Sequence, residues 1–494
     1  MIMERERRLL EVQEDFAQTI KVVSQAMREG WPIHQLELSL WKRALQTNRL
    51  LLEAFVAGQG TGDLGPTIEH EGRTLRQLEE THERRYVSIF GELKIRRTIY
   101  GTRETQKHEL VPLDARLHLP DSDFSYVLQD WDQALCVERS HEASRATIER
   151  ILGIGQSVRS LEQMNVSMAR EVKSFRAAVP PPPARKEGPI LVVTADGKGV
   201  PMRREAGEEA PRRVRLKKGD KANKKRQACV GAVYTIEPFR RTAASVVDEI
   251  MHDRAERRRP APQHKELRAD LTRMIDGAEV NGKELIFSWF EEQIEARNPQ
   301  GRKDLVAIFD GDPALWKMVK CHLPGAVGVL DLFHTMERLW QAAHCFSPEG
   351  SREAEAFVTE RLERILEGEI GRVIGGMKQM ATKHRLKGSR KAQLMKAVKY
   401  LQKRRRFMRY DTYLAAGYPI GSGVVEGACR HLVKDRMEQT GMHWRAQGAQ
   451  AMLDLRAVYL NGDWEAFQKH RIEEERRRLY PYREFVQARW RAAA

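Results

Sequence analysis

Three carboxylates in this 494-residue chain stand where a phosphoryl-transfer site would need them. Asp196 follows the apolar run 190–194 and precedes a glycine, and Asp310 repeats that pattern in VAIFDGD. Glu426 stands on the first turn of the helix expected after the Gly-Ser-Gly at 421–423. Hard cations such as Mg²⁺ prefer carboxylate oxygens, and two of them can activate a nucleophile and stabilise the leaving oxygen. The pattern therefore predicts a site for two Mg²⁺ or Mn²⁺ ions at Asp196, Asp310 and Glu426.

Each of these carboxylates also has a purely structural interpretation. Asp196 followed by glycine is typical of a tight hairpin turn between strands. Asp310 could cap the next helix, although Asp312 is better placed for that role, and Glu426 could favour a helix N-terminus through the helix dipole. The repeated order of apolar strand, aspartate and glycine favours a common site over three unrelated explanations.

A second acidic element lies in the segment VGVLDLFHTMERLW. Asp331 is expected at a strand end, and His334 follows three residues later as a helix begins, so both side chains can face one side. This spacing suits a metal-ligand pair, and it suits equally well a helix cap at Asp331 with a packed histidine at His334. No second cluster of histidines and carboxylates has zinc-ligand spacing, so no zinc site is predicted.

The composition points to a polyanionic partner. The chain has 85 Lys and Arg against 69 Asp and Glu, a formal net charge of +16. Such a surplus favours nucleic acid binding through counterion release at phosphates, although a basic protein without such a partner is also possible. We expect double-stranded DNA as the partner, contacted by five cations. Arg430 and Lys434 follow Glu426 at i+4 and i+8 and so are expected on the same helix face, where ordinary pairing on a solvated helix is the alternative. Lys198 follows Asp196, and Arg96 and Arg97 are expected on the polar face of a hairpin, which fits a plain solvated β-face equally well.

Cysteine usage and hydropathy indicate an intracellular protein. The five cysteines are scattered and never form a C-x-x-C pair, which suits reduced thiols. The charged N-terminus has no signal-peptide character, and no apolar run reaches the ~20 residues that cross a membrane. We therefore expect a soluble cytoplasmic protein.

The order of elements predicts a multidomain α+β and α/β protein. Helical periodicity indicates two helices within 3–58, and period-two alternation indicates a hairpin broken at Gly91. A helix, a glycine-containing turn and a second helix near Ser157 have helix-turn-helix spacing, which αα-hairpins without DNA also show. The expected regions are a helical region (1–60), a small β region (61–120), a helix-turn-helix-like DNA-binding region (121–178), a proline-rich linker (179–188), the first part of a catalytic core (189–336), a helical insertion (337–416), the glutamate helix of the core (417–460) and a C-terminal tail (461–494).

Three segments, TADGKGVPMR, LDLFHTMERLW and YDTYLAAGYPIGSGVVEGACRHLVKDRMEQTGMHW, resemble bacterial insertion-sequence transposases of the Kra type. This is a DDE-transposase group related to the Mutator superfamily, and the resemblance extends from about residue 84 to residue 464. It implies an RNase H-like catalytic core with a helical insertion. It also implies that Asp196, Asp310 and Glu426 are the catalytic triad, supported by Asp331 and His334.

The implied activity is binding of terminal inverted repeats, Mg²⁺-dependent strand cleavage and transfer of the freed 3′-OH into target DNA. The implied setting is the nucleoid of a bacterial cytoplasm, with a homodimer or higher oligomer pairing two DNA ends. Two alternatives stay open: an RNase H-like nuclease without strand transfer, and a domesticated DNA-binding protein that has lost catalysis. The choice of Asp310 or Asp331 as second metal ligand also stays open, with Asp310 preferred because its strand-Asp-Gly context repeats that of Asp196.

Overall fold

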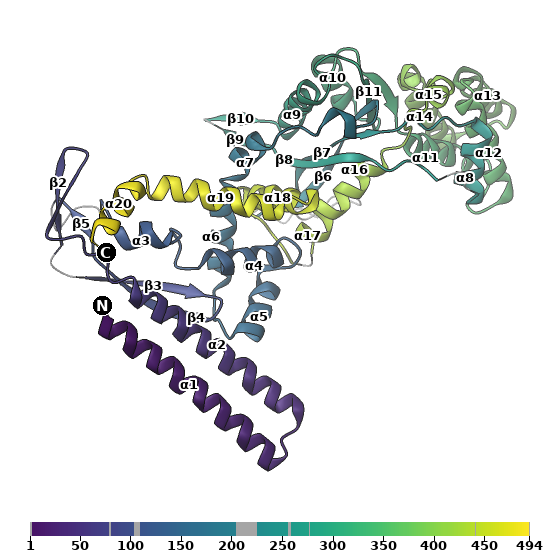
Figure 1. The fold of residues 1–494 in the computed structure, drawn as a ribbon. Helices are drawn as coiled ribbons and strands as arrows, with labels where there is room; N and C mark the ends of the chain where they lie inside the picture. The colour runs from purple at the N-terminus through teal and green to yellow at the C-terminus, as the bar shows by residue number, and fades with distance from the viewer. Residues whose placement is uncertain are drawn as a thin grey trace, which may run out of the picture. The chain divides into compact units, whose positions relative to one another are not determined.

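A computed structural model of the protein describes residues 2–78, 81–102, 109–203, 225–254, 258–275, 277–439 and 441–493 (Figure 1). The chain divides into two compact units, of which the first combines Met1–Arg176 with Asp463–Ala494 and the second is Ala177–Gly462. The second unit thus begins beside the predicted proline-rich linker, and the residues expected to form a separate tail belong to the first unit. Among the described residues, no helix has both the length and the apolar character required to span a membrane.

The first unit starts with the predicted pair of helices, α1 (Ile2–Glu29) and α2 (Ile33–Gly58), which run as a hairpin (Figure 1). Ala26 of α1 and Ala54 of α2 are buried. Arg8 bridges them by an ion pair with Glu53 at 3.3 Å. Many large apolar side chains of the hairpin remain exposed, among them Leu9, Leu10, Phe16, Ile20, Leu38, Trp41, Leu51 and Phe55.

Two small antiparallel sheets follow the helical hairpin. One joins β1 (Thr67–His70), β2 (Arg73–Gln77) and β5 (Tyr100–Gly101). The other is the predicted hairpin, in which β3 (His82–Ser88) pairs with β4 (Gly91–Arg97) and Ser88 lies opposite Gly91. The prediction of a chain reversal at Gly91 is therefore confirmed.

Helices complete the first unit. The predicted helix, glycine turn and second helix are present as α5 (His141–Leu152) and α6 (Val158–Ala169), with Gly153 in the left-handed region at φ +70° and the Ser157 hydroxyl accepting a hydrogen bond from Ser160 N. Trp464 ties the C-terminal segment to this unit, since its indole N–H donates to Asp130 at 2.7 Å. The remaining helices are α3 (Pro112–Leu117), α4 (Tyr126–Cys136), α7 (Val172–Ala178), which reaches into the second unit, α19 (Trp464–Leu479) and α20 (Arg483–Ala493).

A mixed five-stranded sheet forms the centre of the second unit. Its strand order is β12-β11-β6-β7-β8, in which β11 runs parallel to both β12 and β6, and β7 runs antiparallel to β6 and β8. The predicted strand-helix-strand-helix unit at 304–340 is confirmed. The strands are β6 (Ile190–Pro201), β7 (Lys225–Ile236), β8 (Gln263–Leu271), β11 (Asp304–Phe309) and β12 (Val327–Leu330), and a short separate ribbon joins β9 (Arg273–Ile275) to β10 (Ala278–Val280).

Helices pack tightly on this sheet. A Cβ on Gly231 of β7 would lie 2.7 Å from Ile286, so only glycine allows α9 to approach this closely. Phe287 of the same helix stacks on Phe309 of β11, with ring centroids 5.6 Å apart. The helices and the 3₁₀ turn of this part of the second unit are η1 (Ala184–Lys186), α8 (Ala243–His252), α9 (Gly282–Arg297), α10 (Pro313–His322), α11 (Leu332–Ala343) and α18 (Ala446–Asn461).

The segment predicted as a helical insertion at 337–416 is helical. It contains the end of α11, then α12 (Arg352–Leu366), α13 (Ile370–Lys383), α14 (Gly388–Arg404), the 3₁₀ turn η2 (Arg405–Phe407) and α15 (Tyr410–Ala416). Beyond it, α16 (Gly423–Ala428) continues into a π-helical segment η3 (Cys429–Lys434) and α17 (Asp435–Met437). The basic loop predicted at 211–226 lies outside the described residues, apart from Lys225 and Arg226.

Candidate metal centre

Three side chains from distant parts of the second unit meet at one place. Asp331 follows β12 and caps α11, His334 lies on the first turn of α11, and Glu426 lies on α16 beyond the helical insertion. One ligand atom of each side chain lies within 4.8 Å of those of the other two. Two carboxylates and one imidazole therefore converge where the core resumes after the insertion.

Asp331 holds this cluster together. Its side chain is fully buried, and Oδ1 accepts hydrogen bonds from the backbone N of His334 at 2.9 Å and from His334 Nδ1 at 3.1 Å. Oδ2 accepts from the backbone N of Ser422 at 2.5 Å, which fixes the glycine-rich turn before Glu426. Burial would raise the pKa of Asp331, but the hydrogen bonds from His334 and Ser422 outweigh it and hold the pKa below its usual value. The carboxylate is therefore ionised, and the helix cap predicted as one interpretation of Asp331 is present.

His334 is a cation in this environment. The hydrogen bond to Asp331 raises the pKa of His334 to about 9, against the opposing effect of burial, and the charges of Asp331 and Asp310 add to the increase. A metal ion needs the neutral imidazole, so binding at His334 would compete with a proton. Without a metal, the imidazolium balances part of the surrounding negative charge.

Asp310 and Asp196 lie close enough to sense one another electrostatically. Burial raises the pKa of Asp310, and the charge of Asp196 raises it further. The sheet explains this proximity, because β6 and β11 are parallel neighbours with Thr194 opposite Ile308, and each aspartate stands two residues further along. Asp310 Oδ1 accepts from Asp312 N at 2.8 Å, while Asp312 caps α10 as predicted.

The prediction that a strand ends at Asp196 is wrong, and so is the hairpin-turn interpretation of this position. β6 continues through Gly197 to Pro201, because β7 supplies a partner for every residue, with Asp196 opposite Val230. Asp196 is thus an interior strand residue at the point where β6 extends beyond its parallel neighbour β11. Asp310 does follow directly after its strand, as predicted.

Two residues that were not predicted for the site, Ser422 and Cys429, contact its carboxylates. The Ser422 hydroxyl donates to Glu426 Oε1 at 3.1 Å while its backbone N binds Asp331, so Ser422 links two members of the cluster. The thiol of Cys429 donates to Asp196 Oδ2 at 3.6 Å, and burial raises the pKa of that thiol. The Gly-Ser-Gly pattern gave a signal for a turn at Ser422, whereas nothing in the sequence linked Cys429 to Asp196.

The predicted DNA-binding cations occupy different settings. Arg430 is 71% exposed with Nε 3.8 Å from Asp435, and Lys434 is also exposed. The prediction that they share a face with Glu426 assumed α-helical spacing, which the π-helical segment Cys429–Lys434 does not keep. Lys198 is half-buried on β6, opposite Ala228.

The prediction that Arg96 and Arg97 share a polar face is wrong. Consecutive strand residues point to opposite faces, so Arg96 is 73% exposed beside Glu83 whereas Arg97 is 16% exposed and forms an ion pair with the buried carboxylate of Asp114. Arg84 of the neighbouring strand pairs with the same carboxylate at 3.0 Å. The side chain of Arg97 therefore lies mostly inside the first unit.

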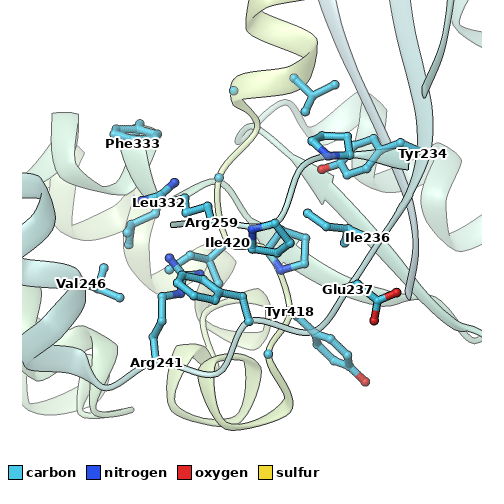
Figure 2. Close-up of a pocket in the computed structure, with 18 of the residues that line it drawn as sticks. Tyr234, Ile236, Glu237, Arg241, Val246, Arg259, Leu332, Phe333, Tyr418 and Ile420 are labelled. Carbon is cyan, nitrogen blue, oxygen red and sulfur yellow. The ribbon is translucent and has the colours of Figure 1, made fainter. Parts of the chain in front are cut away.

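An apolar pocket of about 270 Å³ adjoins the acidic cluster (Figure 2). Leu332 and Phe333, the two residues between Asp331 and His334, line one side, and Tyr234 and Ile236 line the other (Figure 2). Arg241 also lines the pocket, and burial lowers the pKa of its guanidinium to about 10. The charged cluster thus borders a largely apolar surface on this side.

The donor atoms of Asp331, His334 and Glu426 fit a divalent cation with small adjustments once His334 has lost its proton. Two ligand atoms on one Mg²⁺ ion lie at most about 4.2 Å apart, because each lies about 2.1 Å from the metal. The limit of 4.8 Å for Asp331, His334 and Glu426 therefore requires side-chain movements of less than about 1 Å. The carboxylates suit Mg²⁺ and Mn²⁺, and a bound cation would offset the burial, and to a smaller extent the charge of Asp196, that raise the pKa of Asp310.

Comparison with known proteins adds no further assignment. No protein-family model matches the chain, and no curated protein is similar to it.

Proposed function

We propose that this chain is a DDE transposase of an insertion sequence, with an RNase H-like core that cleaves DNA and joins the freed 3′-OH to target DNA. The observation that carries the proposal is the convergence of Asp331, His334 and Glu426 from both sides of the insertion, with Asp310 and Asp196 in electrostatic contact nearby. The mixed sheet with its parallel pairs supports an RNase H-like core, and the family resemblance of the same segments supports the reaction.

The residues divide into metal-binding and positioning roles. Asp196, Asp310 and Glu426, rather than the pair Asp331 and His334, would hold two Mg²⁺ or Mn²⁺ ions, because His334 carries a proton. When bound, these ions supply charge neutralisation and an activated nucleophile. Asp331 orients His334 and the turn at Ser422, and so positions Glu426. His334 contributes a positive charge beside the site that the substrate phosphate would occupy.

The partner in this proposal is double-stranded DNA, as transposon ends and as target. Arg430, Lys434 and Lys198 would contact backbone phosphates near the acidic centre, and the exposed Arg96 would contact DNA from the first unit. The helix-turn-helix-like pair α5 and α6 would read the terminal repeats. Exposed apolar side chains on α1 and α2 support a homodimer or higher oligomer, acting at the bacterial nucleoid.

A cleavage and strand-transfer assay tests this function. Asp196→Asn, Asp310→Asn and Glu426→Gln should each lose Mg²⁺-dependent cleavage and insertion of a pre-cleaved 3′-OH end, while duplex binding is retained. Glu353→Gln, on the first turn of α12, is a matched control and should keep both activities.

Other results would redirect the proposal. Cleavage without joining of a pre-cleaved end would indicate a nuclease, and DNA binding without any metal-dependent reaction would indicate a binding protein. Full activity of Glu426→Gln would refute the assignment of the triad. Near-normal cleavage by Asp310→Asn with loss in Asp331→Asn would make Asp331 the second metal ligand.

A further inference from the structure

A basic cavity lies at the C-terminal end of the helical insertion, separate from the acidic cluster. It has a volume of about 610 Å³ and is lined by the start of α13 and by the segment that links α14 to α15. Four lining side chains are exposed cations, namely Lys403, Arg405, Arg406 and Arg409. Asp411 is the single acidic residue among the lining residues that the structure describes.

These four cations are not neutralised by the surrounding protein. Within the described part of the chain, none of them has a carboxylate oxygen within ion-pair distance. Converging like charges repel one another and lower the stability of the fold unless an anion binds between them. Solvent-facing lysines of α14, such as Lys391 and Lys396, do not line the cavity, which distinguishes it from an ordinary solvated helix face.

The segment that links α14 to α15 and carries these cations is held against the core at the ends of β11 and β12, which Asp310 and Asp331 follow directly. Phe407 stacks on Trp316 with ring centroids 3.6 Å apart, and the Trp316 indole N–H donates to the backbone carbonyl of Asp310 at 2.7 Å. Arg404 donates to the carbonyl oxygen of Gly311, the residue after Asp310.

A second attachment reaches the neighbouring strand. The Tyr410 hydroxyl lies 2.7 Å from the carbonyl oxygen of Leu330, to which it donates, and 3.1 Å from the hydroxyl of Thr335. Leu330 directly precedes Asp331 in the chain. The cations between Arg404 and Tyr410 are therefore positioned by the same two strand ends as Asp310 and Asp331.

We propose that this cavity binds consecutive backbone phosphates of the DNA duplex whose strand is cleaved at the acidic centre. Guanidinium groups match phosphate oxygens in two-pronged geometry, and three arginines with a lysine provide several such contacts. This inference rests on the proposed function and adds a DNA contact surface in the helical insertion. The rigid attachment beside Asp310 and Asp331 would keep a fixed register between the held phosphates and the cleavage site.

Salt-dependent DNA binding by the full-length protein tests the inference. The variant Arg405→Gln/Arg406→Gln/Arg409→Gln removes three charges, and its logarithmic salt slope for a random-sequence duplex should be shallower by about 3. Its affinity at about 0.15 M salt should fall on the order of 100-fold. The charge-conserving variant Arg405→Lys/Arg406→Lys/Arg409→Lys should keep most of the slope, which separates loss of charge from misfolding.

A matched control removes the same charge from the same helical region. Lys391→Gln/Lys396→Gln/Lys399→Gln alters exposed side chains of α14 that do not line the cavity, and it should change the slope much less. Equal losses in the two glutamine triples would show a net-charge effect and overturn the inference. An unchanged slope in the arginine triple would overturn it as well.

Two further outcomes distinguish this inference from the proposed function and from a site for a small phosphate ligand. If the wild-type chain does not bind duplex DNA, the proposed function fails. Titration with inorganic phosphate tests whether the cavity binds a small phosphate ligand in place of DNA phosphates. Phosphate binding that is lost in the arginine triple, together with unchanged duplex binding, would assign the cavity to a small phosphate ligand and overturn the DNA contact.

Discussion

Replacing Asp331 by asparagine removes the charge that organises the acidic cluster while keeping the size of the side chain. In the folded protein, Asp331 Oδ1 accepts from both the backbone N and the ring Nδ1 of His334. The hydrogen bond from the ring Nδ1 is the largest cause of the raised pKa of His334, which reaches about 9 from an ordinary value of 6.5. We expect the pKa of His334 to fall most of the way back in Asp331→Asn, with Asp310 retaining a small part of the increase.

The magnitude follows from the size of the shift. A difference of about 2.5 pKa units corresponds to about 3 kcal/mol, at 1.36 kcal/mol per unit. The imidazole is 30% exposed, so solvent screening reduces the expected contribution to about 1–2 kcal/mol. Because the folded pKa is raised, this stabilisation is fully present below pH 6.5 and is lost as the pH rises through 9.

Two measurements follow the change. NMR titration of the fifteen labelled histidines reports the pKa of His334, which the missing resonance in His334→Gln identifies. Hydrogen exchange at the start of α11 reports local stability, because a chain of two units does not unfold in one two-state step. The wild type should lose protection between about pH 6.5 and pH 9, and Asp331→Asn should be less protected than the wild type below that range.

Asp435→Asn is a control at an exposed carboxylate, which lies 3.1 Å from His431, and it should leave the titration of His334 unchanged. A wild-type His334 that titrates near 6.5 would refute the reasoning. An Asp331→Asn variant whose His334 still titrates near 9 would refute it equally.

Two further predictions concern packing and buried charge. Gly311→Ala should destabilise the second unit by about 1–3 kcal/mol in thermal unfolding, because the new Cβ would lie 2.3 Å from the Tyr400 ring, whereas Gly375→Ala has open space and should be neutral or stabilising. Burial raises the pKa of Asp132 to about 7, so the folded first unit loses stability as the pH rises from 3.8 through 7. As the pH rises from about 5 to about 8, the unfolding free energy of Asp132→Asn should therefore increase by about 2 kcal/mol relative to that of the wild type. The exposed Asp121→Asn should show no such increase. Equal pH profiles for Asp132→Asn and the wild type would contradict this prediction.

Local patterns predicted several elements of both units. The helical hairpin, the reversal at Gly91 and the helix start near Ser157 in the first unit, and the strand-helix-strand-helix unit around Asp310 in the second, all depend on residues close together in the chain. Hydrophobic period, glycine placement and capping side chains act over one or two turns, so a single sequence expresses them directly. The placement of Asp331 at a helix start and of Glu426 after a glycine-rich turn was predictable for the same reason.

The final positions of several predicted site residues depend on contacts that no local sequence pattern contains. β6 runs past Asp196 because the partner strand β7 continues beside it, and Arg97 is withdrawn from the surface because Asp114 lies opposite in the folded unit. The π-helical segment changes the faces of Arg430 and Lys434. The first two outcomes are set by a neighbour distant in sequence, which outweighs the local preference.

The order of amino acids indicates which side chains are available for chemistry and which elements carry them. Folding brings His334 and Asp331 to Glu426 across the helical insertion, places Ser422 between them, and sets Cys429 against Asp196. The physical reason is the low polarity of the interior, where the pKa of a carboxylate or imidazole is set by the hydrogen bonds and charges brought against it. Those partners exist only once the strands and α16 have packed together.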